Sequence, residues 1–151
     1  MRSIINCLTK VGLWLSSAIA IWIAFPNFAL AALPVRSTPI TVKISLGNTA
    51  NELKFEPNNL QLKAGATYKL LLSNFSPQKH YFTAVEFANK SWTQKVEAGN
   101  VEIKGAIQEL ELRSSTKAEW WLVPMRPGIY QLRCTVPGHT EAGMIGTITV
   151  K

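Results

Sequence analysis

The sequence predicts an all-β fold, a Greek-key β-sandwich of about eight strands with a short irregular or helical crossover. Three observations favour this fold. From residue 39 onward, short segments alternate apolar and polar residues or are rich in β-branched residues, and each has ordinary strand length. Turn-forming residues separate the segments. No long helical pattern of the kind that βαβ units require lies between them.

The first half of this region predicts four strands, which read ITVKISL, NLQLK, TYKLLLSN and YFTAVEF and comprise residues 40–46, 59–63, 67–74 and 81–87. The turns between them use residues that tolerate bent or left-handed backbone, namely Gly47-Asn48, Ala64-Gly65 and Ser76-Pro77. Residues 88–106 are expected to cross between the two sheets. Within this stretch, residues 91–96 could form a turn or two of helix. Gly99-Asn100 and Gly105 break any longer helical pattern.

The second half predicts four more strands, which read IQELELR, AEWWLV, IYQLRC and IGTITV and comprise residues 107–113, 118–123, 129–134 and 145–150. Ser114-Ser115 and the stretch 124–128 supply turns between them. Trp120 and Trp121 are neighbours on one strand, so one ring is expected to face the core and the other the opposite side.

Residues 1–31 have the chemistry of an export signal. Arg2 and Lys10 form a positive leader, 11–24 is an apolar run without a charge, and Ala-Leu-Ala at 29–31 is the small-x-small pattern that a signal peptidase accepts. We therefore expect cleavage after this site.

Cleavage would leave residues 32–151 as one domain, a normal size for a single core. The alternative is an uncleaved membrane anchor, because residues 11–35 carry no charge and are long enough to span a bilayer. The expected location is the bacterial periplasm, with a thylakoid lumen or a membrane-anchored form facing the periplasm as alternatives.

The charge of residues 32–151 indicates the kind of partner. They carry 14 Lys and Arg against 9 Glu, a net charge of +5, and the chain contains no Asp. The cations are spread out, without the basic runs or repeated aromatic platforms of nucleic-acid binders, so we expect no nucleic-acid partner. A basic surface favours partners with acidic docking surfaces. A membrane partner is expected only if the N-terminal segment is retained, and the protein is expected to be a monomer.

Cysteine usage limits what the domain can do. Removal of residues 1–31 takes Cys7 with it and leaves Cys134 without a second thiol to pair with, although exported proteins usually form disulfides. Cys134 must therefore be buried, reactive or bound to metal.

The segment 134–144 holds a thiolate, an imidazole and a thioether within eleven residues, in the order Cys134, His139, Met144. Soft sulfur together with imidazole suits copper, and two His and one Cys with a weak axial Met form the blue-copper arrangement. The only other histidine is His80, which follows the Ser76-Pro77 turn and could point into a site at one end of a sandwich. Each residue alone has a bland explanation, as a core Cys, a solvated His or a packing Met. Their joint order and spacing favour a metal site.

The loop between Cys134 and Met144 has a mechanical role. Pro137 stiffens it and Gly138 permits a turn that a side chain would hinder. Such a loop would hold the ligands in one geometry whether copper is oxidised or reduced, and little reorganisation allows fast electron transfer.

Residues 128–150, with Gly-Ile-Tyr at 128–130 and Ala-Gly-Met-Ile-Gly at 142–146, resemble the carboxy-terminal part of plastocyanins, azurins and auracyanin-like small blue-copper proteins. The likeness extends more weakly to Phe55-Glu56-Pro57, the Gly65 turn, residues 68–74 and His80. The resemblance implies a cupredoxin fold, one type 1 copper ion and service as a mobile electron carrier. By matching positions it implies that the copper ligands are His80, Cys134, His139 and Met144.

Three departures limit the resemblance to the superfamily. Four residues separate Cys134 from His139, as in azurin and auracyanin, whereas four between His139 and Met144 is nearer plastocyanin. Tyr81 follows His80 where these families usually have an Asn that ties the two ligand loops together. Arg133 stands where plastocyanins commonly carry an aromatic residue beside an acidic docking patch. Plastocyanin's docking partners are therefore not transferred.

The expected function is that of an exported blue-copper protein that carries one electron at a time between a redox donor and an acceptor. The alternative is a periplasmic copper-delivery protein, although such metallochaperones tend to have open, Met- and His-rich sites. We expect no enzyme. Copper oxidases and nitrite reductases need more histidines than His80 and His139, and a Cys134–His139 hydrolase would lack an Asp to orient its base.

Overall fold

The structure is a computed structural model that describes residues 38–151. The predicted export signal, its cleavage site and the boundary at residue 32 lie outside the described residues and stay predictions. Among residues 38–151, no helix is both long and apolar enough to cross a membrane.

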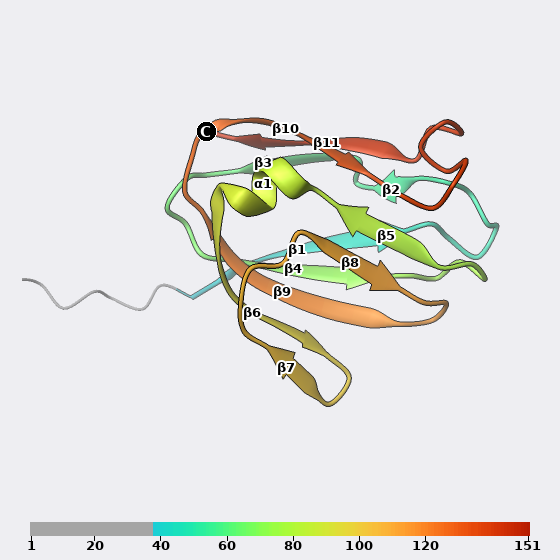
Figure 1. Cartoon of the computed structure of the whole chain (residues 1–151), viewed down its shortest axis with the longest axis horizontal. Coiled ribbons are helices and arrows are strands. Elements are labelled where there is room, and N and C mark those ends of the chain that lie inside the picture. Colours follow the sequence, from blue (N-terminus) through green and yellow to red (C-terminus); the bar gives the residue numbers. More distant parts are fainter. Residues whose placement is uncertain (1–37) are drawn as a thin grey trace, which may run out of the picture. The chain divides into compact units, whose positions relative to one another are not determined.

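Two β-sheets lie face to face and enclose the core (Figure 1). The first sheet has the order β2-β1-β4-β9-β6-β7, with β1 Ile40–Leu46, β2 Phe55–Glu56, β4 Tyr68–Ser73, β6 Ser91–Ala98, β7 Val101–Ile103 and β9 Lys117–Pro124. The second sheet has the order β3-β11-β10-β5-β8, with β3 Asn59–Leu62, β5 His80–Thr83, β8 Glu109–Leu112, β10 Gly128–Arg133 and β11 Ile145–Val150. One helix, α1, spans Val85–Asn89. The predicted all-β sandwich is confirmed.

The pairing of the strands is mixed. Most neighbours are antiparallel, but β1 runs parallel to β4, and β3 runs parallel to β11. Neither parallel pair joins strands that are consecutive in the chain.

The crossover differs from the prediction. Residues 91–96, where a turn or two of helix was expected, instead belong to β6. This strand pairs antiparallel with β9, and its own residue Val96 is fully buried. The helix lies earlier, in α1, and ends the strand predicted for 81–87 at Thr83. Pairing with the long strand β9 and burial of Val96 override the weak local helical pattern, as tertiary context often does.

Aromatic side chains fill the centre of the sandwich. Trp120 is fully buried and meets Phe82 and Phe87 edge to face, with ring centroids 6.1 Å apart in both pairs. Trp121 lies on the outer face of the same strand, where the ammonium of Lys95 lies 4.9 Å from its ring centroid. The prediction that the two tryptophan rings face opposite sides is confirmed.

The fold brings three strand ends together at one end of the second sheet. β10 and β11 pair antiparallel up to Arg133 and Ile145, so the loop 134–144 closes their common end. β5 pairs with β10 through Thr83 and Arg133, which places the start of β5 beside this loop. His80 begins β5 and Cys134 follows β10, so residues far apart in the sequence meet here.

Candidate metal centre

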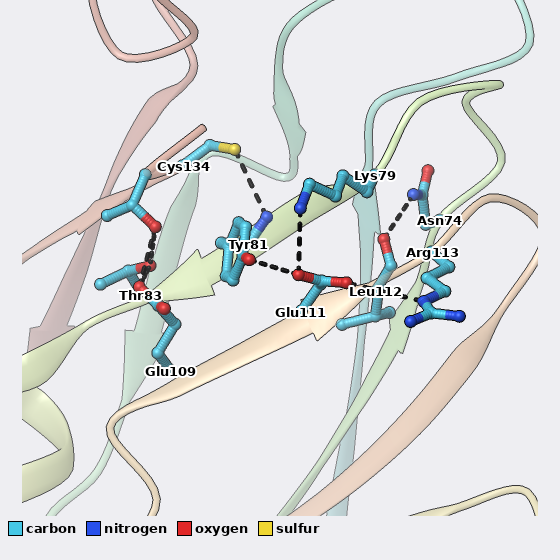
Figure 2. A network of polar contacts seen from close by, with 10 residues as sticks. Asn74, Lys79, Tyr81, Thr83, Glu109, Glu111, Leu112, Arg113 and Cys134 are labelled. Carbon is cyan, nitrogen blue, oxygen red and sulfur yellow. Dashed lines mark hydrogen bonds and ion pairs between the residues drawn. The ribbon is translucent and has the colours of Figure 1, made fainter. Parts of the chain in front are cut away.

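His80 is held rigidly at the start of β5. Its side chain is completely buried, and the backbone of Gly47, with a φ of +69°, lies directly against its ring. The turn before it is fixed by Asn74, whose side-chain amide donates to the carbonyls of Gln78 and Leu112 at 2.7 and 2.8 Å. Figure 2 shows the bond to Leu112, which ties this turn to β8.

Cys134 and His139 are positioned by the folding of their own loop. The N–H of Cys134 donates to the carbonyl of Met144 at 3.1 Å, and the N–H of Met144 donates to the carbonyl of His139 at 2.9 Å. Gly138 has a φ of +82°, the left-handed backbone that a side chain disfavours, so the turn expected at this glycine is present. Cys134 is fully buried and His139 is only 7% exposed.

The three predicted ligands His80, Cys134 and His139 point their donor atoms at one position. The two Nδ1 atoms are 3.2 Å apart, and the sulfur lies 3.9 Å from Nδ1 of His80 and 3.5 Å from Nδ1 of His139. A first-row ion with bonds of about 2.0 Å to nitrogen and about 2.3 Å to sulfur, in a trigonal plane, would separate its donors by about 3.5 to 3.7 Å. The donor set therefore fits such an ion in both spacing and chemistry.

Met144, the fourth predicted residue, lies at the end of the same loop. Its side chain is fully buried and belongs to the hydrophobic core, together with Cys134. The two backbone bonds described above tie Met144 to both Cys134 and His139. A thioether in this place has the softness of a weak axial copper ligand.

The surroundings favour a neutral imidazole at His80 and provide a hydrogen-bond donor to the sulfur of Cys134. Burial, followed by the nearby His139 ring, lowers the pKa of His80, so this ring stays neutral and able to bind metal at lower pH. The backbone N–H of Tyr81 donates to the sulfur of Cys134 at 3.3 Å (Figure 2). Among residues 38–151, Nε2 of His80 has no hydrogen-bond partner, and a metal on Nδ1 would place the ring proton there.

Tyr81, which stands where the resembling families usually have Asn, makes contacts of its own away from the site. Its side chain turns outward, where the phenol donates to the carboxylate of Glu111, directly opposite on β8. Tyr81 thus keeps the backbone N–H that faces the sulfur but provides no side-chain link to the ligand loop.

Another group of residues that the sequence analysis missed supplies that link. Thr83 and Thr135 both contact the carboxylate of Glu109. Figure 2 shows Thr83 and Glu109 side by side on neighbouring strands. The sequence contains no local signal for this cluster, because its members come from β5, β8 and the ligand loop. Only the register between strands brings them together.

The comparisons with known proteins agree with this geometry. The family model described as copper binding proteins, plastocyanin/azurin family, matches residues 42–151. The plastocyanin of Prochlorothrix hollandica is 30% identical over 122 residues, which cover 81% of this chain and 80% of that protein. The copper-resistant cuproprotein CopI of Rubrivivax gelatinosus is 25% identical over 115 residues, which cover 74% of this chain and 66% of that protein.

Solved structures confirm the fold. The blue copper protein auracyanin A of Chloroflexus aurantiacus superposes with a TM-score of 0.55 and 24% identity, covering 76% of this chain and 100% of that one. The fold is therefore that of the cupredoxins, as the resemblance implied.

Proposed function

The chain belongs to the plastocyanin/azurin family of copper-binding proteins, and from this premise we propose that it is a one-electron carrier whose copper is held by His80, Cys134, His139 and Met144. The observation that carries the proposal is the convergence of two imidazole nitrogens and one cysteine sulfur within 3.2 to 3.9 Å of one another, on three buried side chains. Bound copper supplies the redox couple, Cu(II) and Cu(I).

Each side chain has a role that follows from its chemistry. The Cys134 thiolate would be the strong, covalent ligand, and His80 and His139 would hold the ion through their imidazole nitrogens. Met144 would supply a weakly bound thioether that helps to set the potential. The hydrogen bond from Tyr81 N–H reduces the charge on the sulfur and fixes its direction.

Electron transfer is favoured by the rigidity of this arrangement. His80 is fixed by burial, while backbone hydrogen bonds hold Cys134, His139 and Met144 in one loop. A site whose donors already stand at metal-binding distances needs little rearrangement when the charge of the ion changes. The barrier to gaining or losing one electron is correspondingly small.

His139 is the side chain through which the electron would pass in and out. It is mostly buried, while the nearby residues Pro137, Ala142 and Ile145 are apolar and exposed and would give this end an apolar contact surface. A partner pressed on this surface would come close to the ring without exposing copper to water. The net charge of +5 on residues 32–151 favours redox partners with acidic docking surfaces.

The test is to express the full-length chain in a Gram-negative bacterium, purify it from the periplasm and add Cu(II). A type 1 site gives an intense blue colour and a characteristic electron-spin spectrum, and Cys134→Ser is expected to abolish both. Met144→Gln should shift the potential while copper stays bound. A colourless wild type, or colour that survives C134S, overturns the proposal. Mass spectrometry of the same sample tests cleavage after Ala31.

Copper delivery or resistance is the second candidate, and the likeness to the copper-resistant cuproprotein CopI favours it. The buried ligand set, in contrast, suits retention of the ion rather than its release. Reversible redox cycling at one potential supports the carrier. Rapid loss of copper to a chelator, without reversible cycling, supports delivery.

A further inference from the structure

The carboxylate of Glu109 joins a strand of the second sheet to the ligand loop. Its Oε2 atom lies 2.6 Å from Oγ1 of Thr83 on β5 and 2.8 Å from Oγ1 of Thr135 in the loop. Thr135 directly follows Cys134, so this contact acts one residue away from the thiolate.

A count of protons shows that the carboxylate is the centre of this cluster. The two threonine hydroxyls are 3.2 Å apart, and each has only one proton to donate. An ionised carboxylate can only accept hydrogen bonds. The two shortest contacts, those of Thr83 and Thr135 with Glu109, are therefore hydrogen bonds in which each hydroxyl donates to the carboxylate. Glu109 thereby orients both threonines, and no proton is left for a bond between them.

The strand register explains why Glu109 reaches this position. β8 is the edge strand of its sheet, and Glu109 lies directly opposite Thr83 on β5. Thr83 in turn lies opposite Arg133, the last residue of β10. Glu109 therefore stands on the same line across the sheet as the point where the ligand loop begins.

Glu111 provides a natural comparison on the same strand. Its carboxylate accepts from Tyr81 and pairs with Lys79 and Arg113, at 3.3 and 3.7 Å. None of these partners belongs to the ligand loop, as Figure 2 also shows. Glu109 thus contacts Thr83 at the end of β5, whereas Glu111 contacts Tyr81 near its start.

We propose that Glu109 is a positioning residue that fixes the start of the copper loop through Thr135, in place of the side-chain link that Tyr81 does not supply. This inference rests on the proposed function for its effect on copper, but the contact itself exists in the copper-free chain. Glu109 is anchored to β5 by Thr83 and reaches the ligand loop through Thr135.

The first experiment uses the copper-free full-length protein and amide hydrogen exchange. Replacing Glu109 with Ala should speed exchange at Cys134, His139 and Met144, on the order of tenfold for the loss of hydrogen bonds to a charged group. Amides of β4 should be unchanged. Glu111→Ala removes the same charge from the same strand and should leave the loop amides unchanged.

The second experiment measures how quickly the copper-loaded protein loses its ion to an excess of chelator. E109A and Thr135→Val should each speed release by about tenfold, the low end for loss of a residue that orients a ligand. The double variant should release copper no more than about twofold faster than either single variant, because both break one contact. Thr135→Ser keeps the hydroxyl and should restore the wild-type rate.

The outcomes separate the two proposals. A wild type that forms no blue site overturns the proposed function, and the exchange experiment still tests the Glu109 contact. The positioning role is overturned if E109A matches E111A in both exchange and copper release. It is also overturned if the effects of E109A and T135V on release multiply, since residues acting through one contact cannot act independently.

Discussion

Gly47 lies against the ring of His80, and replacing it with alanine tests how tightly the fold holds this histidine. A Cβ at position 47 would stand 2.8 Å from Nε2 of His80 and 2.9 Å from Cβ of Ser76. Both side chains are fully buried, so neither can move into solvent. The overlap must push the His80 ring, the Ser76 segment or the backbone of residue 47 out of place.

The expected cost has two parts. A left-handed backbone costs an alanine about 1 to 2 kcal/mol relative to glycine, and Gly47 has a φ of +69°. Overpacking of a buried position adds about 1 to 3 kcal/mol. Gly47→Ala should therefore lower the free energy of unfolding by about 2 to 5 kcal/mol.

Gly65 offers a matched control. Its φ is +77°, close to that of Gly47, but a Cβ there meets nothing within 4 Å. Gly65→Ala should therefore cost only the backbone part, about 1 to 2 kcal/mol. The difference between the two variants isolates the overlap with His80 and Ser76.

The assay is urea unfolding of the copper-free variants, followed by titration with copper. G47A should weaken copper binding by about tenfold or more, because displacement of a ligand-orienting contact has this effect on metal sites. G65A should bind copper as the wild type does. Equal losses of stability in the two variants, together with equal copper affinity, would refute the reasoning.

Three further predictions concern acid stability, strand pairing and the Tyr81 contact. The pKa of His80 is lowered in the folded protein, so at acidic pH the unfolded chain binds a proton that the folded chain does not. The copper-free protein should therefore lose stability as the pH falls below about 6.5, by up to about 1.4 kcal/mol per pH unit. Urea unfolding at pH 7.5 and 5.5 checks this, and His80→Gln should flatten the dependence. Gly146→Ala would place a Cβ 2.6 Å from the carbonyl oxygen of Asn58, just before β3, and should lower the free energy of unfolding by about 2 to 4 kcal/mol in the same assay. A loss of less than half of that would show that β11 and β3 can move apart at this point without penalty. Tyr81→Phe removes an exposed contact with Glu111 and should change the free energy of unfolding by less than about 1 kcal/mol. The blue colour of the copper-loaded protein should persist, because the N–H of Tyr81 that donates to the Cys134 sulfur belongs to the backbone. Loss of colour would contradict the view that Tyr81 serves the site only through its backbone.

Strands whose signal is local could be predicted well from the sequence. β1 occupies the predicted residues 40–46, and β11 occupies 145–150, because both segments show alternation or β-branched residues between clear turns. β6 could not be predicted, since Ser91–Ala98 shows no strong alternation and becomes a strand by pairing with β9. Residues 85–89 form a helix that begins inside the strand predicted for 81–87, and Phe87 of this helix packs against Trp120.

The sequence by itself predicted the donor types and all four candidate ligands. It tied only Cys134, His139 and Met144 to one place, because they lie within one short loop whose length limits how far apart they can be. The tertiary structure alone decided that His80 meets them, 54 residues from Cys134 in the chain. It also decided that Glu109 reaches Thr135. The physical reason is that such contacts depend on strand register, which the packing of the whole core sets and no short stretch of sequence encodes.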